Sequence, residues 1–372
     1  MKSERKKWIR LVIFLLPVLL LFTGINYLAD PANVFHGFSE DMSEAMLEGH
    51  TVQVNSNNLD DREVLGYLIE KMPDRIDTMV WGSSIALCID AEMAGGDTFL
   101  NMAVSSADYY DLMACMALME CNGKQADRMI LALDTRLFDP GMYANEGRHD
   151  KFMDYSEYMI DLLENGAPDE KMPQAAKLRS VSELSAGSSV WSGLKQLFSV
   201  SYFQWSVEYI KAQGFDVLFG DRWKVVEGES TSNRYLPDYS VVYTQDMEAV
   251  TEEQIAEQCA GFWMAGTVTP YANAAEENLK GFEKLIQYLQ SQGVEVELFL
   301  NPYAPALWDR VTEEQFPMIF ELEEYAGYLA AEYGIEVQGS FNPYNIGMTN
   351  GDYYDALHVR KISLKEKFNF AD

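Results

Sequence analysis

One serine and a distant aspartate–histidine pair carry the residue types of nucleophilic catalysis. Ser84 lies in "TMVWGSSIALC", whereas Asp355 and His358 lie in "DYYDALH", near the other end of the chain. A serine hydroxyl needs a base to become a nucleophile, and neutral imidazole is the usual one. An aspartate held to the far ring nitrogen fixes the tautomer and stabilises the imidazolium. The three residues therefore predict acyl transfer through a covalent intermediate, provided that the fold brings them together.

Each half of this pattern also has an ordinary structural explanation. A Gly-Ser-Ser turn at the start of a helix is often only an N-cap. An aspartate three residues before a histidine arises readily by chance in a chain with 58 acidic residues. What makes the combination moderately specific is its position, because the serine follows the first predicted strand and the pair follows the last.

Strand-like and helix-like segments alternate in two stretches, residues 76–135 and 271–372. The strand-like segments are "IDTMVW", "DTFLN", "ADRMILAL", "VEVELFL" and "IEVQGSF". The helical segments between them include "ADYYDLMACMALMEC", "NAAEENLKGFEKLIQYLQSQG" and one that starts at Thr312 with a capping-box pattern. This alternation predicts an α/β fold with a parallel sheet and helices on both faces. Ligands bind such sheets beyond the carboxyl ends of the strands, where Ser84, Asp355 and His358 fall.

Two other regions do not alternate. Residues 30–75 read as a connector with one helix, "DREVLGYLIEKM", and residues 136–270 read as an inserted, mostly helical subdomain that covers one end of the sheet. The insertion is rich in aromatic residues. These either form a sugar-stacking wall or, as we favour for most of them, pack within the subdomain: Trp191, Trp205, Trp223, Tyr235 and Tyr239.

The N-terminus has the pattern of a membrane anchor. Five basic side chains in "MKSERKKWIR" precede an uncharged run over residues 11–29. About 20 apolar residues suffice to cross a bilayer as a helix, and basic residues ahead of the span favour a cytoplasmic N-terminus. No convincing small-x-small cleavage site follows, so we expect residues 1–29 to be an uncleaved signal anchor, with cleavage as the alternative. The prediction is a single-pass plasma-membrane protein whose C-terminal domain is extracytoplasmic.

Composition excludes several classes of function. A formal net charge of −30 disfavours nucleic acid as a partner. The four cysteines form no CxxC motif and no cluster with histidine, so we predict neither a metal site nor a cofactor. His149 has acidic neighbours, but an exposed loop explains them better than a metal site, and His36 and His50 look incidental.

Three segments in this order, "VWGSSIA", "FLNMAVSSADYYD" and "DYYDALHVR", resemble the SGNH/GDSL hydrolase superfamily. The segments "YLADPANVF" and "FNPYNIGMTNGDYYDALH" are similar to its membrane-anchored bacterial branch, the DltD-like proteins and relatives of the alginate O-acetylation proteins. The resemblance covers the anchor and the alternating stretches well and residues 136–270 poorly. It implies a flavodoxin-like three-layer sandwich, with Ser84 as nucleophile, His358 as base and Asp355 as its orienting partner.

The chain departs from this family in the groups that bind the oxyanion. Ser106 stands where the family usually has a glycine whose N–H faces the oxyanion, and Asp134 follows the strand where an asparagine is expected. An anionic carboxylate would oppose a developing negative charge. Asn101 and Asn301 are the candidates to replace the missing donor.

The resemblance implies a membrane-anchored serine hydrolase or O-acyltransferase that acts on cell-envelope polysaccharide. Its substrates would be an acylated donor and a cell-surface glycan, and a membrane-bound O-acyltransferase would be its partner. Two alternatives stay open. One is a stand-alone acyl esterase, and the other is a binding or scaffold protein that kept the fold while its catalysis degraded.

Overall fold

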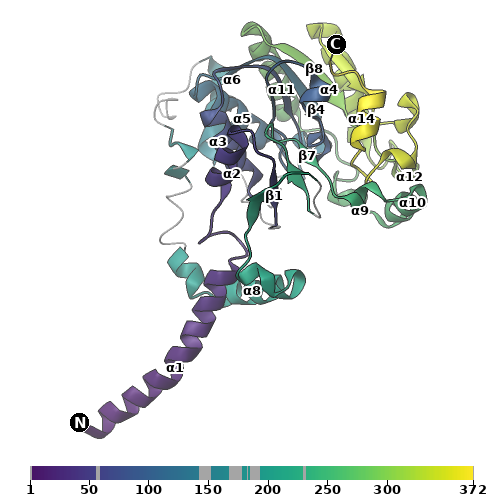
Figure 1. Cartoon of the computed structure of the whole chain (residues 1–372). Coiled ribbons are helices and arrows are strands. Elements are labelled where there is room, and N and C mark those ends of the chain that lie inside the picture. The colour runs from purple at the N-terminus through teal and green to yellow at the C-terminus, as the bar shows by residue number, and fades with distance from the viewer. Residues whose placement is uncertain are drawn as a thin grey trace.

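The computed structural model describes residues 2–55, 59–141, 152–166, 178–181, 183–184, 193–228 and 232–371, with side chains from residue 13 onward. A rounded body holds most of the chain, and the N-terminal helix α1 (Lys2–Ala29) projects from it past helix α8 (Val200–Gln213) (Figure 1). His149 and Trp191, both considered above, lie outside the described residues.

A five-stranded parallel sheet forms the centre of the body. Its strands run in the order β3-β2-β4-β8-β9, and each pairs in parallel with its neighbours. They are β2 (Arg75–Trp81), β3 (Phe99–Asn101), β4 (Gln125–Leu133), β8 (Glu295–Leu300) and β9 (Glu336–Gly339). The last five residues of β4 and of β8 are all buried, as expected for strands covered on both faces. The predicted α/β fold with a parallel sheet is confirmed.

The strand order creates a crevice at the carboxyl edge of the sheet. From β2 the chain moves outward to β3, then crosses back to β4 on the other side of β2. The connections after β2 and β4 therefore diverge, and this divergence opens the crevice in which doubly wound sheets bind their ligands. Ser84 lies directly after β2, at this point.

Helices cover both sides of the sheet (Figure 1). One group contains α3 (Asp61–Lys71), α5 (Tyr109–Cys121), α6 (Met153–Asn165) and α11 (Glu276–Ser291), where α6 packs on both α5 and α11. The other side carries α4 (Ala91–Ala94) and α14 (Lys361–Lys367). An ion pair joins these two helices, because Nζ of Lys361 lies 2.5 Å from Oδ2 of Asp90 at the N-cap of α4.

The helix predicted from Thr312 begins five residues later, as α13 (Pro317–Tyr333). Proline lacks an N–H and is therefore favoured in the first turn of a helix, where that group has no partner, and disfavoured further in. Thr312 instead closes a short turn, with its hydroxyl accepting the N–H of Gln315 at 3.3 Å. The helix ends at Gly334, as predicted, because this glycine takes the left-handed conformation at φ 64°.

A second, antiparallel sheet was not predicted. It has the order β5-β1-β6-β7 and joins the connector to the insertion. Its strands are β1 (Val52–Val54), β5 (Trp223–Val225), β6 (Arg234–Tyr235) and β7 (Val241–Val242). Segments of two or three residues are too short to show the alternation that identifies a strand in a sequence.

The remaining elements are short or peripheral. The helices are α2 (Ser39–Leu47), α9 (Gln245–Glu248), α10 (Glu252–Gly261) and α12 (Pro305–Trp308). The 3₁₀ turns are η1 (Ser84–Ala86), η2 (Thr135–Leu137), η6 (Phe215–Leu218), η7 (Met264–Gly266), η8 (Pro343–Ile346) and η9 (Asn350–Asp352).

The predicted anchor lies within the single helix α1. Within the described part of the chain, no helix combines the length and the apolarity that crossing a membrane requires. The side chains of residues 1–12, where the predicted anchor begins, are outside the described part. The transmembrane helix is therefore not confirmed.

Candidate active site

Ser84, His358 and Asp355 form one hydrogen-bonded chain. The Oγ of Ser84 lies 2.8 Å from Nε2 of His358. The Nδ1 of the same ring lies 2.8 Å from Oδ2 and 2.9 Å from Oδ1 of Asp355. With the ring proton on Nδ1, the imidazole donates to the carboxylate, and Nε2 is free to accept the serine proton. The fold thus joins residues 274 positions apart in the arrangement of a catalytic triad.

Asp355 is held as a carboxylate by its own loop. Its Oδ1 also accepts the backbone N–H groups of Leu357, at 2.8 Å, and of His358, at 2.9 Å. Burial acts to raise the pKa of Asp355, but the hydrogen bond and charge of His358 and these two N–H donors outweigh it. The pKa of Asp355 therefore lies below its usual range, and the group is ionised at neutral pH.

The loop that carries the pair is braced on both sides. Tyr353 and Val359 form an isolated antiparallel bridge, and the N–H of Tyr354 donates to the carbonyl of His358 at 2.8 Å. The side-chain amide of Asn301, just after β8, donates to the carbonyl of Leu357 at 2.9 Å. These contacts fix the imidazole against the adjacent strand end.

The turn that carries Ser84 depends on Gly82. A Cβ at this position would lie 2.8 Å from the Cβ of Ala132 on β4 and 2.9 Å from the Cβ of Ala86 in η1. Contacts this close exclude any larger residue without displacement of the turn. Glycine therefore lets the end of β2 approach β4 closely enough to position Ser84 over the crevice.

Ser83 ties this turn to the next strand. Its Oγ donates to Oδ2 of Asp134 at 2.5 Å, and Oδ1 of Asp134 accepts the N–H of Arg136 at 3.1 Å. Asp134 directly follows β4, so its carboxylate joins the two strand ends at the crevice. The sequence suggested only that this charge would oppose an oxyanion. In the structure, Asp134 holds the residue before the nucleophile.

Ser106 adopts the backbone conformation of the glycine that it replaces. Its φ is +53°, in the left-handed region that glycine favours. Its loop borders the nucleophile turn, because the N–H of Val104 donates to the carbonyl of Gly82 at 3.0 Å. Within the described residues, the N–H groups of Ser84 and Ser106 donate to no backbone carbonyl among the turn and loop contacts. They are therefore two backbone donors that remain free to bind an oxyanion at this edge.

The two asparagines proposed as oxyanion donors have other roles, and this corrects the prediction. Asn101 is fully buried, and its amide donates to the carbonyls of Ala86 and Ile89, each at 2.8 Å. The amide of Asn301 donates to the carbonyls of Leu357 and Pro302. An amide has two N–H donors, so neither residue has one left for a substrate.

Tyr243 of the insertion lies beside His358, and it was not identified from the sequence. Its ring meets the His358 ring edge-on at a centroid distance of 6.3 Å and the Tyr354 ring at 4.9 Å. Burial raises the pKa of Tyr243 well above its usual value, so its hydroxyl stays neutral. Only an aromatic-rich segment marked the region, and no feature of the sequence separates this tyrosine from the others in it.

The aromatic residues singled out in the insertion have different fates. Tyr239 is fully buried, and its hydroxyl donates to Asp61 at 2.9 Å, as expected for core packing. Tyr235 and Trp205 instead line a cleft of about 830 Å³ between the body and α8. None of the triad residues lines this cleft, although Ser105, beside Ser106, does.

A smaller cavity of about 20 Å³ lies between Ile85 and Leu357, the neighbours of Ser84 and His358. That space is about enough for one water molecule. Cys88, four residues after Ser84, is no rival nucleophile, because burial raises the pKa of its thiol to about 12. Among the described residues, no three His, Cys, Asp or Glu side chains are grouped so as to hold a metal ion.

No protein-family model matches the chain, and no curated protein matches it significantly.

Proposed function

We propose that the protein is a serine hydrolase or O-acyltransferase of the SGNH type, which acts on cell-envelope polysaccharide outside the cytoplasm. The observation that carries the proposal is the hydrogen-bonded chain from Ser84 through His358 to an ionised Asp355. An N-cap serine and a chance Asp-x-x-His would have no reason to meet at 2.8 Å. The polysaccharide substrate rests on the family resemblance, and the extracytoplasmic location rests on the basic residues ahead of the apolar run of residues 11–29.

In the proposed reaction, Ser84 attacks the carbonyl of an acyl donor while Nε2 of His358 removes the hydroxyl proton. The tetrahedral intermediate collapses to an acyl-serine, and His358 gives its proton to the leaving group. His358 then deprotonates a sugar hydroxyl or water, which attacks the acyl-serine and regenerates the free serine. Asp355 remains a carboxylate throughout and stabilises the imidazolium.

The strand order supports the proposed fold family. Numbered within the central sheet, the order β3-β2-β4-β8-β9 becomes 2-1-3-4-5, which is the flavodoxin-like order. Ser84 follows the first strand of this sheet, and Asp355 and His358 follow the last. The resemblance in sequence implied the same placement.

The scaffold alternative depends on the departures at Ser106 and Asp134. Ser106 has the φ of a glycine, and Asp134 accepts a hydrogen bond from Ser83. Both departures are thus compatible with a working site. The esterase alternative differs from the transferase only in the final acceptor. A membrane-bound O-acyltransferase stays the proposed partner of the transferase.

The proposed function is tested by hydrolysis of a chromogenic acetyl ester by the full chain in detergent, with and without an oligosaccharide acceptor. We expect Ser84→Ala to lower the rate by at least about 10³-fold. Ser83→Ala, the matched control, keeps Ser84 but loses the hydrogen bond to Asp134, so we expect a far smaller loss of rate than for Ser84→Ala. Acyl-oligosaccharide formation would identify a transferase, and release of acetate alone an esterase. Equal rates for wild type and Ser84→Ala would refute both.

A further inference from the structure

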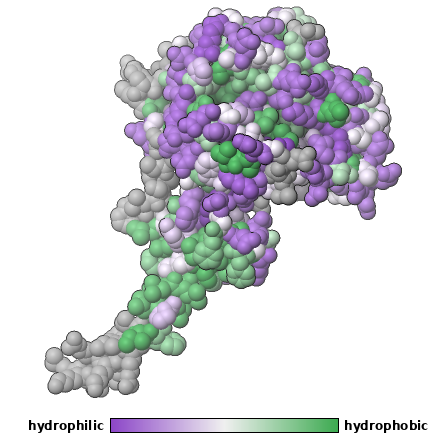
Figure 2. All heavy atoms as spheres, viewed as in Figure 1, coloured by the Kyte–Doolittle hydropathy of each residue, from purple (hydrophilic) through white to green (hydrophobic). Residues whose placement is uncertain are grey.

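Exposed apolar side chains gather on one part of the molecule, which we call the neck. It comprises residues 13–29 of α1 together with residues 193–219, which contain α8 and η6. Figure 2 shows the hydrophobic surface concentrated there, whereas the visible face of the body is mostly hydrophilic. Eight large apolar side chains between Ile13 and Leu21 are each 45–73% exposed.

Residues 193–219 add to this surface beside α1. Phe198 and Val200, at the start of α8, are 55% and 64% exposed. Phe215 and Phe219, in and after η6, are 76% and 81% exposed. Fully burying one such side chain is worth about 1.5–3 kcal/mol, so a cluster left in water is strongly unfavourable. A contiguous surface of this kind marks a site of interaction.

The neck is a fixed structure. Phe22 of α1 stacks on Phe203 of α8 with ring centroids 4.7 Å apart. Asn26 is fully buried, and its amide lies 3.1–3.2 Å from the carbonyls of Gln196, Leu197 and Ser199. The start of α8 is therefore held against α1 by both apolar and polar contacts.

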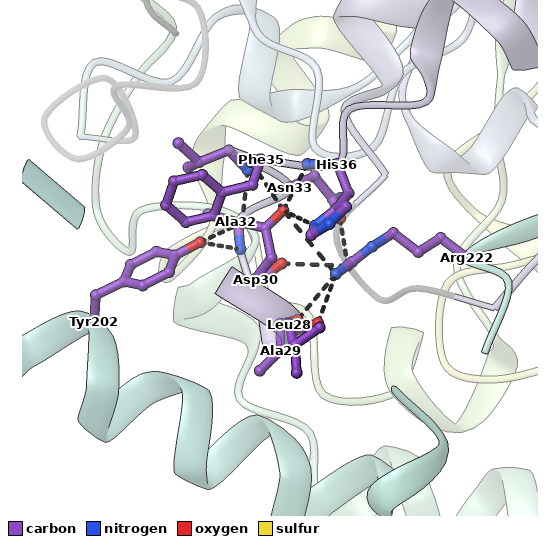
Figure 3. A network of polar contacts seen from close by, with 10 residues as sticks. Leu28, Ala29, Asp30, Ala32, Asn33, Phe35, His36, Tyr202 and Arg222 are labelled. Atoms are coloured by element: carbon purple, nitrogen blue, oxygen red, sulfur yellow. Dashed lines mark hydrogen bonds and ion pairs between the residues drawn. The ribbon is translucent and has the colours of Figure 1, made fainter. Parts of the chain in front are cut away.

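A buried aspartate joins the neck to the chain that enters the body (Figure 3). Asp30 is fully buried, and its carboxylate accepts the N–H groups of Val34, Phe35 and His36 at 2.8–2.9 Å and the hydroxyl of Tyr202 on α8 at 2.7 Å. Arg222 donates to the carbonyls of Leu28 and Ala29, where a cation complements the C-terminus of α1. Residues 193–219 thus keep their place beside α1.

The distribution of apolar side chains favours lipid over a protein partner. The exposed residues of α1 occupy nearly every position from 13 to 21, and so face all directions. A helix that is apolar all round is typical of the interior of a large protein or of a membrane. A partner protein would cover one face and leave the others in water, whereas lipid surrounds the helix and contacts its apolar neighbours at the same depth.

We propose that residues 193–219 rest on a lipid surface around α1, with Phe198, Val200, Phe215 and Phe219 inserted among the lipid chains. This interaction is independent of the chemistry at Ser84 and goes beyond the proposed function. It is an apolar contact, and the chain carries a formal net charge of −30. It therefore needs no anionic lipid and persists at high salt.

The proposed lipid contact would also set which way the carboxyl edge of the main sheet faces. The small antiparallel sheet containing β1 lies between α8 and the rest of the body (Figure 1). On β7 of that sheet, the N–H of Val241 donates to the carbonyl of Leu87 at 2.7 Å, three residues after Ser84. The carboxyl edge of the main sheet therefore faces the same side as the neck, toward the lipid surface.

The test places an environment-sensitive fluorophore on the full chain in phosphatidylcholine vesicles. A cysteine replaces Phe219 in one variant and Ile362, a 63% exposed apolar residue on the body, in the matched control. Both variants carry Cys121→Ser, because the other three native cysteines are buried. Nitroxide-labelled phosphatidylcholine serves as the quencher.

We expect the label at position 219 to emit at shorter wavelength and to lose most of its emission to the lipid-borne quencher, at low and high salt alike. The label at position 362 should show neither effect. Equal, water-like emission at both positions would overturn the proposal. So would a blue shift at 219 that the lipid quencher does not reach and that grows with protein concentration, because a second copy would then cover the surface.

Discussion

In the proposed reaction, the role of His358 as the base depends on Asp355. It holds Nδ1 of the ring at 2.8 Å, and its carboxylate is kept ionised by His358 and by two backbone N–H groups. Removing its charge while keeping its shape would leave the ring in place with the wrong tautomer favoured. We expect Asp355→Asn to lower acyl-ester turnover by about 10²–10⁴-fold. Steady-state kinetics measure this, and a loss below about threefold would contradict the orienting role.

The depressed pKa of Asp355 also predicts a dependence of stability on pH. A carboxyl whose pKa is lower in the folded state stabilises the protein above its unfolded pKa, about 3.9, and this contribution is lost as pH falls through the folded pKa. Wild type should therefore lose stability relative to Asp355→Asn as pH falls below about 4. Thermal midpoints of both proteins measured from neutral to acidic pH test this. A difference that does not change with pH would refute it.

The triad residues could be predicted from the sequence, but the groups around them could not. Ser84, Asp355 and His358 are identified by residue type and by their positions after predicted strands. Asn101 and Asn301 have suitable side chains in suitable segments, yet each amide bonds to carbonyls of distant loops. The direction of an amide depends on tertiary contacts, which the local sequence does not contain.

At the scale of elements, the ends of the strands set the geometry of the site. Gly82 allows β2 to approach β4, Asp134 joins their ends, and the loop after β3 passes beside the turn. The strands β2, β4 and β8 were predictable because their apolar runs are six to nine residues long and mostly buried. The short edge strands β3 and β9 were predictable from their places in the strand–helix alternation. The strands of the small sheet were not predictable, because they form only through pairing between distant segments. The start of α13 was not predicted either, because it is set by Pro317.

The loop after β3 carries a conformational cost at Ser106. Its φ of +53° is uncommon for a residue with a Cβ, whereas glycine adopts such a φ freely. We expect Ser106→Gly to stabilise the protein by up to about 1 kcal/mol and to keep its activity. The control is Ser105→Gly, because Ser105 does not have a positive φ. Glycine there only raises the conformational entropy of the unfolded chain, so this change should lower the stability. Urea unfolding in detergent measures both. Destabilisation by Ser106→Gly would show that its side chain, not its backbone, matters.

At the scale of the whole molecule, the body presents a mostly hydrophilic surface and the neck an apolar one, and Asp30 joins the two (Figures 2 and 3). The sequence indicated the apolar run of α1, but not that residues 193–219 lie beside it, because contacts 170 or more positions apart define that packing. His36, which looked incidental in the sequence, contributes its N–H and lies 3.2 Å from Asp30 through its ring.

The hydrogen bond between Tyr202 and Asp30 predicts that weakening this contact will destabilise the docking of α8. Tyr202→Phe removes the hydrogen bond to the buried Asp30 carboxylate, which costs about 1.5–3 kcal/mol, and the weaker bond that the hydroxyl accepts from the N–H of Ala32. We expect faster amide hydrogen exchange in α8, with the exchange of the central sheet unchanged. Tyr209→Phe is the control, since Tyr209 is also a buried tyrosine of α8 but is not a partner of Asp30. Equal effects of the two changes would show that Asp30 does not fix α8.

The central claim is that Ser84 is a nucleophile activated by His358, and labelling of the full chain with a fluorophosphonate tests it most directly. We expect wild type and Ser83→Ala to be labelled, and Ser84→Ala and His358→Ala to remain unlabelled while keeping the thermal midpoint of a folded protein. That result would establish the nucleophile and its base. A folded wild type that takes no label, or labelling that survives Ser84→Ala, would contradict the proposed enzyme.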